Sequence, residues 1–150
     1  MRFIVHELAD IFTSNGIIPA LTLASAPINE LCNLRIAGFN YMSETKSSVL
    51  SITLLDAFTG YKLSLFGEGN QKVEVICYPS QEIMNDTGNF VQVNDLKEGD
   101  TLFSISGAFI VDKVELLDIG NYNFYSILTN EEYNNIYVSL MAFKSMSVEG

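Results

Sequence analysis

The residues suited to proton transfer and nucleophilic attack are few and widely spaced. The chain has one histidine, His6, and two cysteines, Cys32 and Cys77. An imidazole acts as a general base only beside an orienting acid and a nucleophile, and no spacing here supplies both. Each cysteine has apolar neighbours, and burial raises the pKa of a thiol and silences it. The sequence therefore predicts no catalytic residue, with His6 structural or solvent-exposed and both thiols packed in the core.

The same residues make a poor metal site. Two cysteines and one histidine do not complete a four-ligand zinc site without a carboxylate, and their spacing matches no zinc pattern. The oxygen-rich segments, Asn85–Asn89 and Asp95–Asp100, lack the alternating ligand spacing of a calcium loop, so we expect turns there. No glycine loop of the phosphate-binding kind is present. We therefore expect no metal and no cofactor.

Composition narrows the class of protein. With 150 residues, 48% hydrophobic and 17% charged, the chain is long enough to bury a core as one domain or as two halves that share it. Eighteen acids against eight bases give a net charge of -10, which repels nucleic-acid phosphates and anionic lipids. Two cysteines without CxxC spacing indicate a reducing compartment. We expect neither a nucleic-acid partner nor a membrane partner.

The apolar stretches of the sequence do not match a targeting signal. The longest apolar stretch, Gly16–Leu23, contains Pro19 and is far shorter than the roughly 20 residues that cross a bilayer. The opening residues are interrupted by His6 and Glu7 before a signal-peptide core can form. We therefore expect no secretion signal and no transmembrane segment, and a location in the cytoplasm or in a virion.

The elements that must position these side chains are mostly strands. The spacing of apolar residues from Phe3 to Phe12 predicts an amphipathic helix over the first fourteen residues, stopped by Asn15-Gly16. Ile17–Pro27 is predicted to be an extended connector without a regular element, followed by one brief helical turn through Leu31. Alternating residues then predict strands over 48–54, 61–66 and 72–78, with a hairpin between the first two.

The second half is predicted to be a series of short strands. They cover 90–93, 101–105, 108–117, 122–128 and 135–142, with glycine or asparagine at each break. The fold class is therefore mainly β, with a short N-terminal helix, antiparallel hairpins and a small, partly open barrel or sandwich. We divide the chain into a helix-and-hairpin region over 1–78 and an acidic β domain over 79–150, with one shared core as the alternative. Residues 76–150 hold eleven acids and three bases.

This second half resembles the core of hedgehog/intein (Hint) domains. The resemblance covers residues 77–150 and rests on Phe90–Ser104, which contains the turn Asp95-Leu96-Lys97-Glu98-Gly99-Asp100, and on the strand segments that follow, Gly107–Val111, Val114-Glu115, Tyr122–Thr129 and Asn134–Met141. In that family a strand, such an acidic-leucine-basic-x-glycine-aspartate turn and further strands recur in this order. The resemblance implies a Hint-like β domain.

The resemblance also shows what is missing. Family members that cut or splice place a cysteine or serine at the domain start, a threonine-histidine pair in the middle and a histidine-asparagine pair after the last strand. Cys77 stands roughly where the first belongs, but no histidine follows, and Met141–Met146 contains neither histidine nor asparagine. Without an imidazole acid, the acyl shift slows on the order of a hundredfold or more. The resemblance therefore implies a retained scaffold without its catalytic motifs.

Three classes of function follow from these observations. The first is a non-catalytic structural or assembly protein that docks to neighbouring subunits in a homo- or hetero-oligomer. A virion component such as a bacteriophage head, tail or connector protein is its natural setting by analogy. The second is a degenerate Hint self-processing domain with Cys77 as nucleophile. The third is a β module that binds a small ligand or carbohydrate through aromatic residues: Tyr122, Phe124, Tyr125, Tyr133 and Tyr137.

The assembly hypothesis carries its own expectation. A mean hydropathy of +0.22 with few charges indicates an exposed apolar patch or an edge strand through which copies associate.

Overall fold

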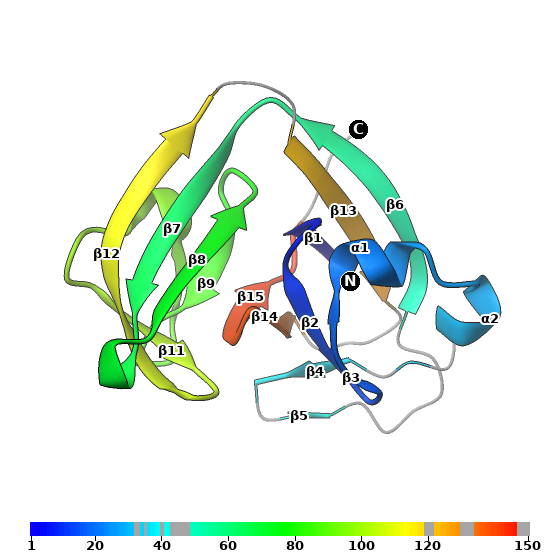
Figure 1. Ribbon diagram of the computed structural model, residues 1–150, viewed down its shortest axis with the longest axis horizontal. Helices are drawn as coiled ribbons and strands as arrows, with labels where there is room; N and C mark the ends of the chain where they lie inside the picture. The colour runs from blue at the N-terminus through cyan, green and yellow to red at the C-terminus, as the bar shows by residue number, and fades with distance from the viewer. Residues whose placement is uncertain are drawn as a thin grey trace.

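The computed structural model describes residues 1–31, 34, 36–39, 41–42, 49–118, 122–129 and 134–146. This part of the chain is built mainly of antiparallel strands, as the sequence predicts (Figure 1). Cys32 and Tyr133 lie outside the described residues. The strands are β1 (Arg2–His6), β2 (Asp10–Thr13), β3 (Gly16–Pro19), β4 (Ala37–Gly38), β5 (Tyr41–Met42), β6 (Val49–Ala57), β7 (Gly60–Phe66), β8 (Lys72–Cys77), β9 (Glu82–Met84), β10 (Phe90–Gln92), β11 (Thr101–Ser104), β12 (Gly107–Leu117), β13 (Tyr122–Thr129), β14 (Asn135–Val138) and β15 (Met141–Lys144), and the helices are α1 (Ala20–Ala24) and α2 (Ile28–Leu31).

Four sheets hold these strands. Their orders are β1-β13-β6, β10-β9-β15-β14-β2-β3, β11-β12-β7-β8 and β4-β5. None of the four closes on itself within the described residues. Strands from the beginning of the chain pair with strands from its end, since β1 pairs with β13 and β2 with β14.

The predicted hairpin between residues 48–54 and 61–66 is wrong, although both strands exist. β6 pairs with β13, while β7 pairs with β12 and β8, so the two strands belong to different sheets. Figure 1 shows them diverging from a common arch. The connection, Phe58-Thr59, lacks the glycine or asparagine that a tight two-residue hairpin needs. The strand that β7 does pair with next along the chain is β8, with which it forms an antiparallel hairpin.

The predicted N-terminal helix is also wrong, because residues 1–14 form β1 and β2. Phe3, Ile4 and Val5 are all buried. Phe3 and Val5 enter the main hydrophobic cluster, whereas Ile4 enters a second cluster with Ala57 and Phe124. A strand presents alternate residues to opposite faces, so it buries all three. A short apolar run does not distinguish such a strand from a helix until its partners are known.

Two further expectations are wrong at the level of single elements, and one is confirmed. The segment predicted to lack regular structure contains β3 and α1, because Ser14-Asn15 forms the β2–β3 turn and Gly16, at φ 106°, begins β3. The strand predicted over 135–142 is two strands, β14 and β15, separated by Ser139-Leu140. The brief helical turn is confirmed as α2, directly after Pro27.

The two oxygen-rich segments are turns, as predicted. The Asn85 side-chain Oδ1 accepts hydrogen bonds from the backbone N–H groups of Thr87 and Asn89, both at 3.0 Å. In the second segment, the Lys97 N–H donates to the Asp100 carboxylate at 2.8 Å, and Gly99 has φ 94°. Within the described residues, no helix is both long enough and apolar enough to cross a membrane.

Candidate functional site

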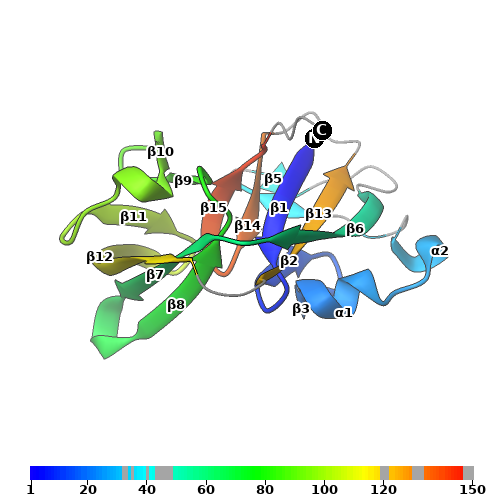
Figure 2. The ribbon, with the colours of Figure 1, turned by 90° about the horizontal axis from the view of Figure 1, so that it is seen from above.

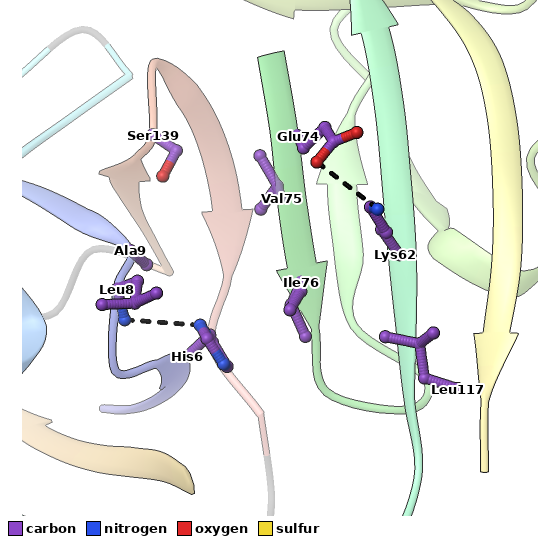
Figure 3. Close-up of a pocket in the computed structure, with 9 residues that line it drawn as sticks. All are labelled: His6, Leu8, Ala9, Lys62, Glu74, Val75, Ile76, Leu117 and Ser139. Carbon is purple, nitrogen blue, oxygen red and sulfur yellow. Dashed lines mark hydrogen bonds and ion pairs between the residues drawn. The ribbon is translucent and has the colours of Figure 1, made fainter. Parts of the chain in front are cut away.

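Two places in the described structure gather polar side chains. The first, the terminal junction, is where β1 meets the end of β15; we define it by Met1, Arg2, Gln81, Lys144 and Met146. The second, the histidine cleft, is a cavity of about 410 Å³ between the turn after β1 and the sheet that contains β7 and β8 (Figure 3). It is lined by His6, Leu8, Ala9, Lys62, Glu74, Val75, Ile76, Leu117 and Ser139.

Backbone hydrogen bonds hold the terminal junction together. The Met146 N–H donates to the Arg2 carbonyl at 2.8 Å. The Met1 amino group donates to the Thr129 carbonyl at 2.9 Å, and the Thr129 N–H donates back to the Met1 carbonyl at 2.8 Å. Met146, two residues after β15, therefore lies beside the first residues of β1.

Gln81 holds the end of β15 through its side-chain amide. Its side chain is fully buried, and its Nε2 donates to the carbonyls of Glu82 at 2.8 Å and Lys144 at 2.9 Å. Its Oε1 has no hydrogen-bond partner, the one such buried side-chain atom among the described residues. Gln81 follows a turn in which Ser80 has φ 68° and the Gln81 N–H donates to the Tyr78 carbonyl.

A polar hollow of about 370 Å³ lies beside Gln81, lined by Ser80, Glu82, Lys144, Ser145 and Met146. Lys144 Nζ lies 3.4 Å from a Glu82 carboxylate oxygen and 5.7 Å from the centre of the Phe90 ring. Among the described residues, Ser80 and Ser145 supply the hydroxyls that line this hollow, and no imidazole lines it. The described lining therefore offers charge and hydrogen bonds but no imidazole base for a hydroxyl nucleophile.

His6 lies at the other end of β1 and not on a helix. Four strand steps separate it from Arg2, which is roughly 13 Å at the usual rise. Its Nδ1 accepts a hydrogen bond from the Leu8 N–H at 3.3 Å, and its ring packs edge-on against Phe124 at 5.6 Å. Burial lowers the pKa of His6 and outweighs the opposing effect of the Glu7 carboxylate. The imidazole is therefore neutral at pH 7 and far from the terminal junction.

Cys77 is a free thiol and is fully buried, as predicted. It belongs to the main hydrophobic cluster. Burial raises its pKa to about 12. Among the described residues, no three histidine, cysteine, aspartate or glutamate side chains are grouped to hold a metal ion.

The predicted aromatic face is only partly exposed. Phe124 is fully buried and contacts His6 and Tyr78, while Tyr122, Tyr125 and Tyr137 are half-buried. The Tyr137 ring contacts Phe12 and Phe103. These aromatic side chains therefore pack largely against the protein itself.

Sequence reasoning missed Gln81 and the ion pair between Lys62 and Glu74. A single glutamine after a strand carries no signal of its own, and its role depends on β15 lying alongside. The ion pair could have been predicted from the register of β7 and β8. Lys62 lies opposite Ile76, so Glu74 is its diagonal neighbour on the same face.

The fold is that of inteins. The chain matches the solution structure of a bacterial intein-like domain from Clostridium thermocellum with TM-score 0.66 and 13% identity, over 95% of this chain and 98% of that one. It matches the crystal structure of a gp41-1 intein variant with TM-score 0.67 and 17% identity, over 95% of this chain and 98% of that one. It matches the crystal structure of the TvoVMA intein with TM-score 0.69 and 15% identity, over 95% of this chain and 96% of that one. Neither a protein-family model nor a curated protein matches the chain.

The chain therefore resembles an intein-like domain with a Hint fold. The likeness extends well beyond residues 77–150, because about 95% of the chain is covered. Identities of 13–17% define the fold alone.

Proposed function

We propose that this chain is a degenerate Hint domain, a framework that holds two chain segments side by side and performs no peptide-bond chemistry. The observation that carries the proposal is the position of its histidine. An imidazole must be within hydrogen-bond reach of the leaving amide to protonate it. His6 lies roughly 13 Å along β1 from Arg2, turned toward Phe124 and the histidine cleft, so it does not reach a peptide bond at the terminal junction.

The state of Cys77 supports the same proposal. A thiol with a pKa of about 12, enclosed in the main cluster, supplies almost no thiolate at neutral pH. This weighs against the second sequence hypothesis, in which Cys77 is the nucleophile of a self-processing domain.

The framework role is supported by the terminal junction. Gln81, the Met146–Arg2 hydrogen bond and the Met1–Thr129 pair tie the first and last strands together. Met1 and Met146 therefore lie close together on the domain.

The test is an incubation of the full chain between two folded reporter domains. We expect the fusion to stay at full length for days at neutral pH, with or without dithiothreitol or hydroxylamine, which would cleave a thioester or ester intermediate. Intact mass spectrometry provides the measurement, and the gp41-1 intein between the same reporters is the positive control.

A Cys77→Ala fusion is the matched variant, and it should behave identically. Joined reporters, or released reporters that disappear in the Cys77→Ala fusion, would refute the proposal.

Docking to other subunits is a second proposal, which the exposed apolar residues favour. Phe58, in the turn between β6 and β7, is 74% exposed, and Leu54 on β6 is 58% exposed. β6 is also the edge of its sheet, with β13 as its partner, and such edges invite pairing. Sedimentation of the purified chain against Phe58→Ser and Leu54→Ser tests it, because a monomer in every case would exclude self-association. A virion setting for such an assembly stays a prediction.

A further inference from the structure

The histidine cleft has polar groups at its two ends and apolar residues between them. Figure 3 shows His6 and Leu8 on one side and the Lys62–Glu74 pair on the other, with Val75 and Ile76 of β8 between. The cavity of about 410 Å³ lies near the lower end of the usual range for small-molecule sites.

The imidazole presents a hydrogen-bond donor to this cleft. Because Nδ1 accepts from the Leu8 N–H, the neutral ring carries its proton on Nε2. Nε2 has no hydrogen-bond partner among the described residues. It is not among the buried side-chain atoms that lack a partner, where Gln81 Oε1 stands alone, so Nε2 is in contact with solvent. Since His6 is only 9% exposed and lines the cavity, this contact is through the cleft.

The opposite end presents both signs of charge. Lys62 Nζ lies 3.4 Å from a Glu74 carboxylate oxygen, and the two side chains are 34% and 62% exposed. That distance exceeds the 2.7–2.9 Å usual for a charge-assisted hydrogen bond. The ammonium therefore keeps protons, and the carboxylate keeps an oxygen, for a further partner.

One rim of the cleft is rigid. Ser139 and Leu140 have φ 47° and 78°, a conformation that costs energy for residues other than glycine. Bonds from other elements hold it: the Ser139 N–H donates to the Asp10 carbonyl at 2.8 Å, and the Ile105 N–H donates to the Leu140 carbonyl at 3.0 Å. Such strain persists where the surroundings fix it, and binding sites are among the places where it gathers.

We propose that the histidine cleft binds a free amino acid with an aromatic side chain. The carboxylate of the ligand pairs with Lys62 and its ammonium with Glu74, so that the two adjacent charges of the zwitterion lie against the two adjacent charges of the protein. Its ring lies along Ile76 and Leu117 and presents its face to the His6 Nε2–H, which donates to it. A zwitterion carries no net charge, so the protein's net charge of -10 does not repel it. This site is independent of the proposed function.

L-Phenylalanine and two analogues test the charge match. A ligand of this size binds with a dissociation constant on the order of 1 mM. At about 10 mM, L-phenylalanine should therefore raise the thermal midpoint by roughly 4 °C. N-acetyl-L-phenylalanine lacks the ammonium and L-phenylalaninamide lacks the carboxylate, and each should leave the midpoint unchanged. Equal shifts from all three compounds, a shift from one analogue alone, or no shift at all would overturn the proposal.

Two variants assign the charges to residues. Glu74→Gln should abolish the preference for L-phenylalanine over the N-acetyl analogue, and Lys62→Gln the preference over the amide. Lys113→Gln is the matched control, since Lys113 pairs with Glu115 and does not line the cleft; it should bind like the original chain. Retained discrimination in both cleft variants would contradict the assignment. If a Gln variant does not fold, Lys62→Ala or Glu74→Ala takes its place, because these also remove the charge.

The single histidine places the ligand without ambiguity. Because the chain has one histidine, its ring signals in an NMR spectrum belong to His6 alone. These signals should shift in proportion to the bound fraction as L-phenylalanine is added. A rise in the thermal midpoint with unmoved His6 signals would place the ligand elsewhere and refute this site.

Discussion

Cys77 and His6 carry the side chains that the sequence offers for covalent chemistry, and their surroundings govern both. The Cys77 thiol has no exposed surface and lies among the apolar residues of the main cluster. His6 is held by the Leu8 N–H and the Phe124 ring. Burial alone raises the pKa of Cys77, and at His6 burial outweighs the Glu7 carboxylate, which by itself would favour imidazolium.

Cys77 should be unreactive in the folded chain. With a pKa of about 12, roughly one thiol in 10,000 is ionised at pH 8. Iodoacetamide at pH 8 should therefore leave the peptide that contains Cys77 unmodified in native buffer and modify it fully in guanidinium chloride, as measured by peptide mass spectrometry. Rapid native labelling of that peptide would contradict the burial.

His6 should make stability depend on pH in mild acid. Its pKa is lowered below 6.5 in the folded chain, so below that pH the unfolded chain binds more protons. The free energy of unfolding should therefore fall as pH decreases from 6.5 to the folded pKa. Urea unfolding between pH 7 and 5.5 measures this slope. His6→Asn, which keeps an acceptor for the Leu8 N–H, should lose that part of it; equal slopes would contradict the prediction.

At the scale of elements, turns decide where the strands end. The turn at Tyr78–Gln81 has proline at its second position and a positive φ at its third, the features of a type II turn. Glycine is preferred at that third position, but Ser80 occupies it with φ 68°. This turn places the Gln81 side chain within hydrogen-bond distance of the Lys144 carbonyl at the end of β15.

Ser80→Gly should stabilise the chain. Removing the Cβ relieves a left-handed conformation that costs about 1–2 kcal/mol, and the greater freedom of glycine in the unfolded chain offsets part of this gain. The expected net gain is roughly 0.5–1 kcal/mol in the free energy of unfolding, measured by urea denaturation. Ser80→Ala, which keeps the Cβ, should be nearly neutral, and a Gly variant no more stable than the Ala variant would show that the turn is unstrained.

At the scale of the whole molecule, the two halves of the chain depend on one another. β12 pairs with β7, β13 pairs with β1 and β6, and β14 pairs with β2. The main hydrophobic cluster contains residues from Phe3 to Phe143. Figure 2 shows β1 beside β13, with β14 and β15 next to them.

Residues 79–150 alone should therefore fail to fold. The fragment keeps the β11–β12 and β14–β15 pairs but lacks β7, β1, β6 and β2, so apolar faces of β12, β13 and β14 stay exposed to water. Circular dichroism and amide NMR dispersion should report an unfolded chain, while the full chain should give a folded spectrum. A folded fragment would support the domain boundary at residue 79 that the sequence suggested.

The sequence by itself determined the mainly β class, because alternation in segments such as Lys72–Cys77 and Ala108–Leu117 is a local property of neighbouring residues. It also determined the turns at Asn85–Asn89 and Asp95–Asp100, where side chains bond to their own backbone. It predicted a buried Cys77 from the apolar residues on either side.

Only the tertiary structure decided which strands pair and which side chains meet. Phe3–Val5 is a strand and not a helix because apolar neighbours cover both of its faces. β6 and β7 belong to different sheets because they pair with distant strands, β6 with β13 and β7 with β12. Likewise Gln81 reaches Lys144, and His6 lies across the cleft from Lys62, only once residues far apart in the chain are brought together. Such contacts depend on the whole packing arrangement and leave no periodic trace in the order of the residues.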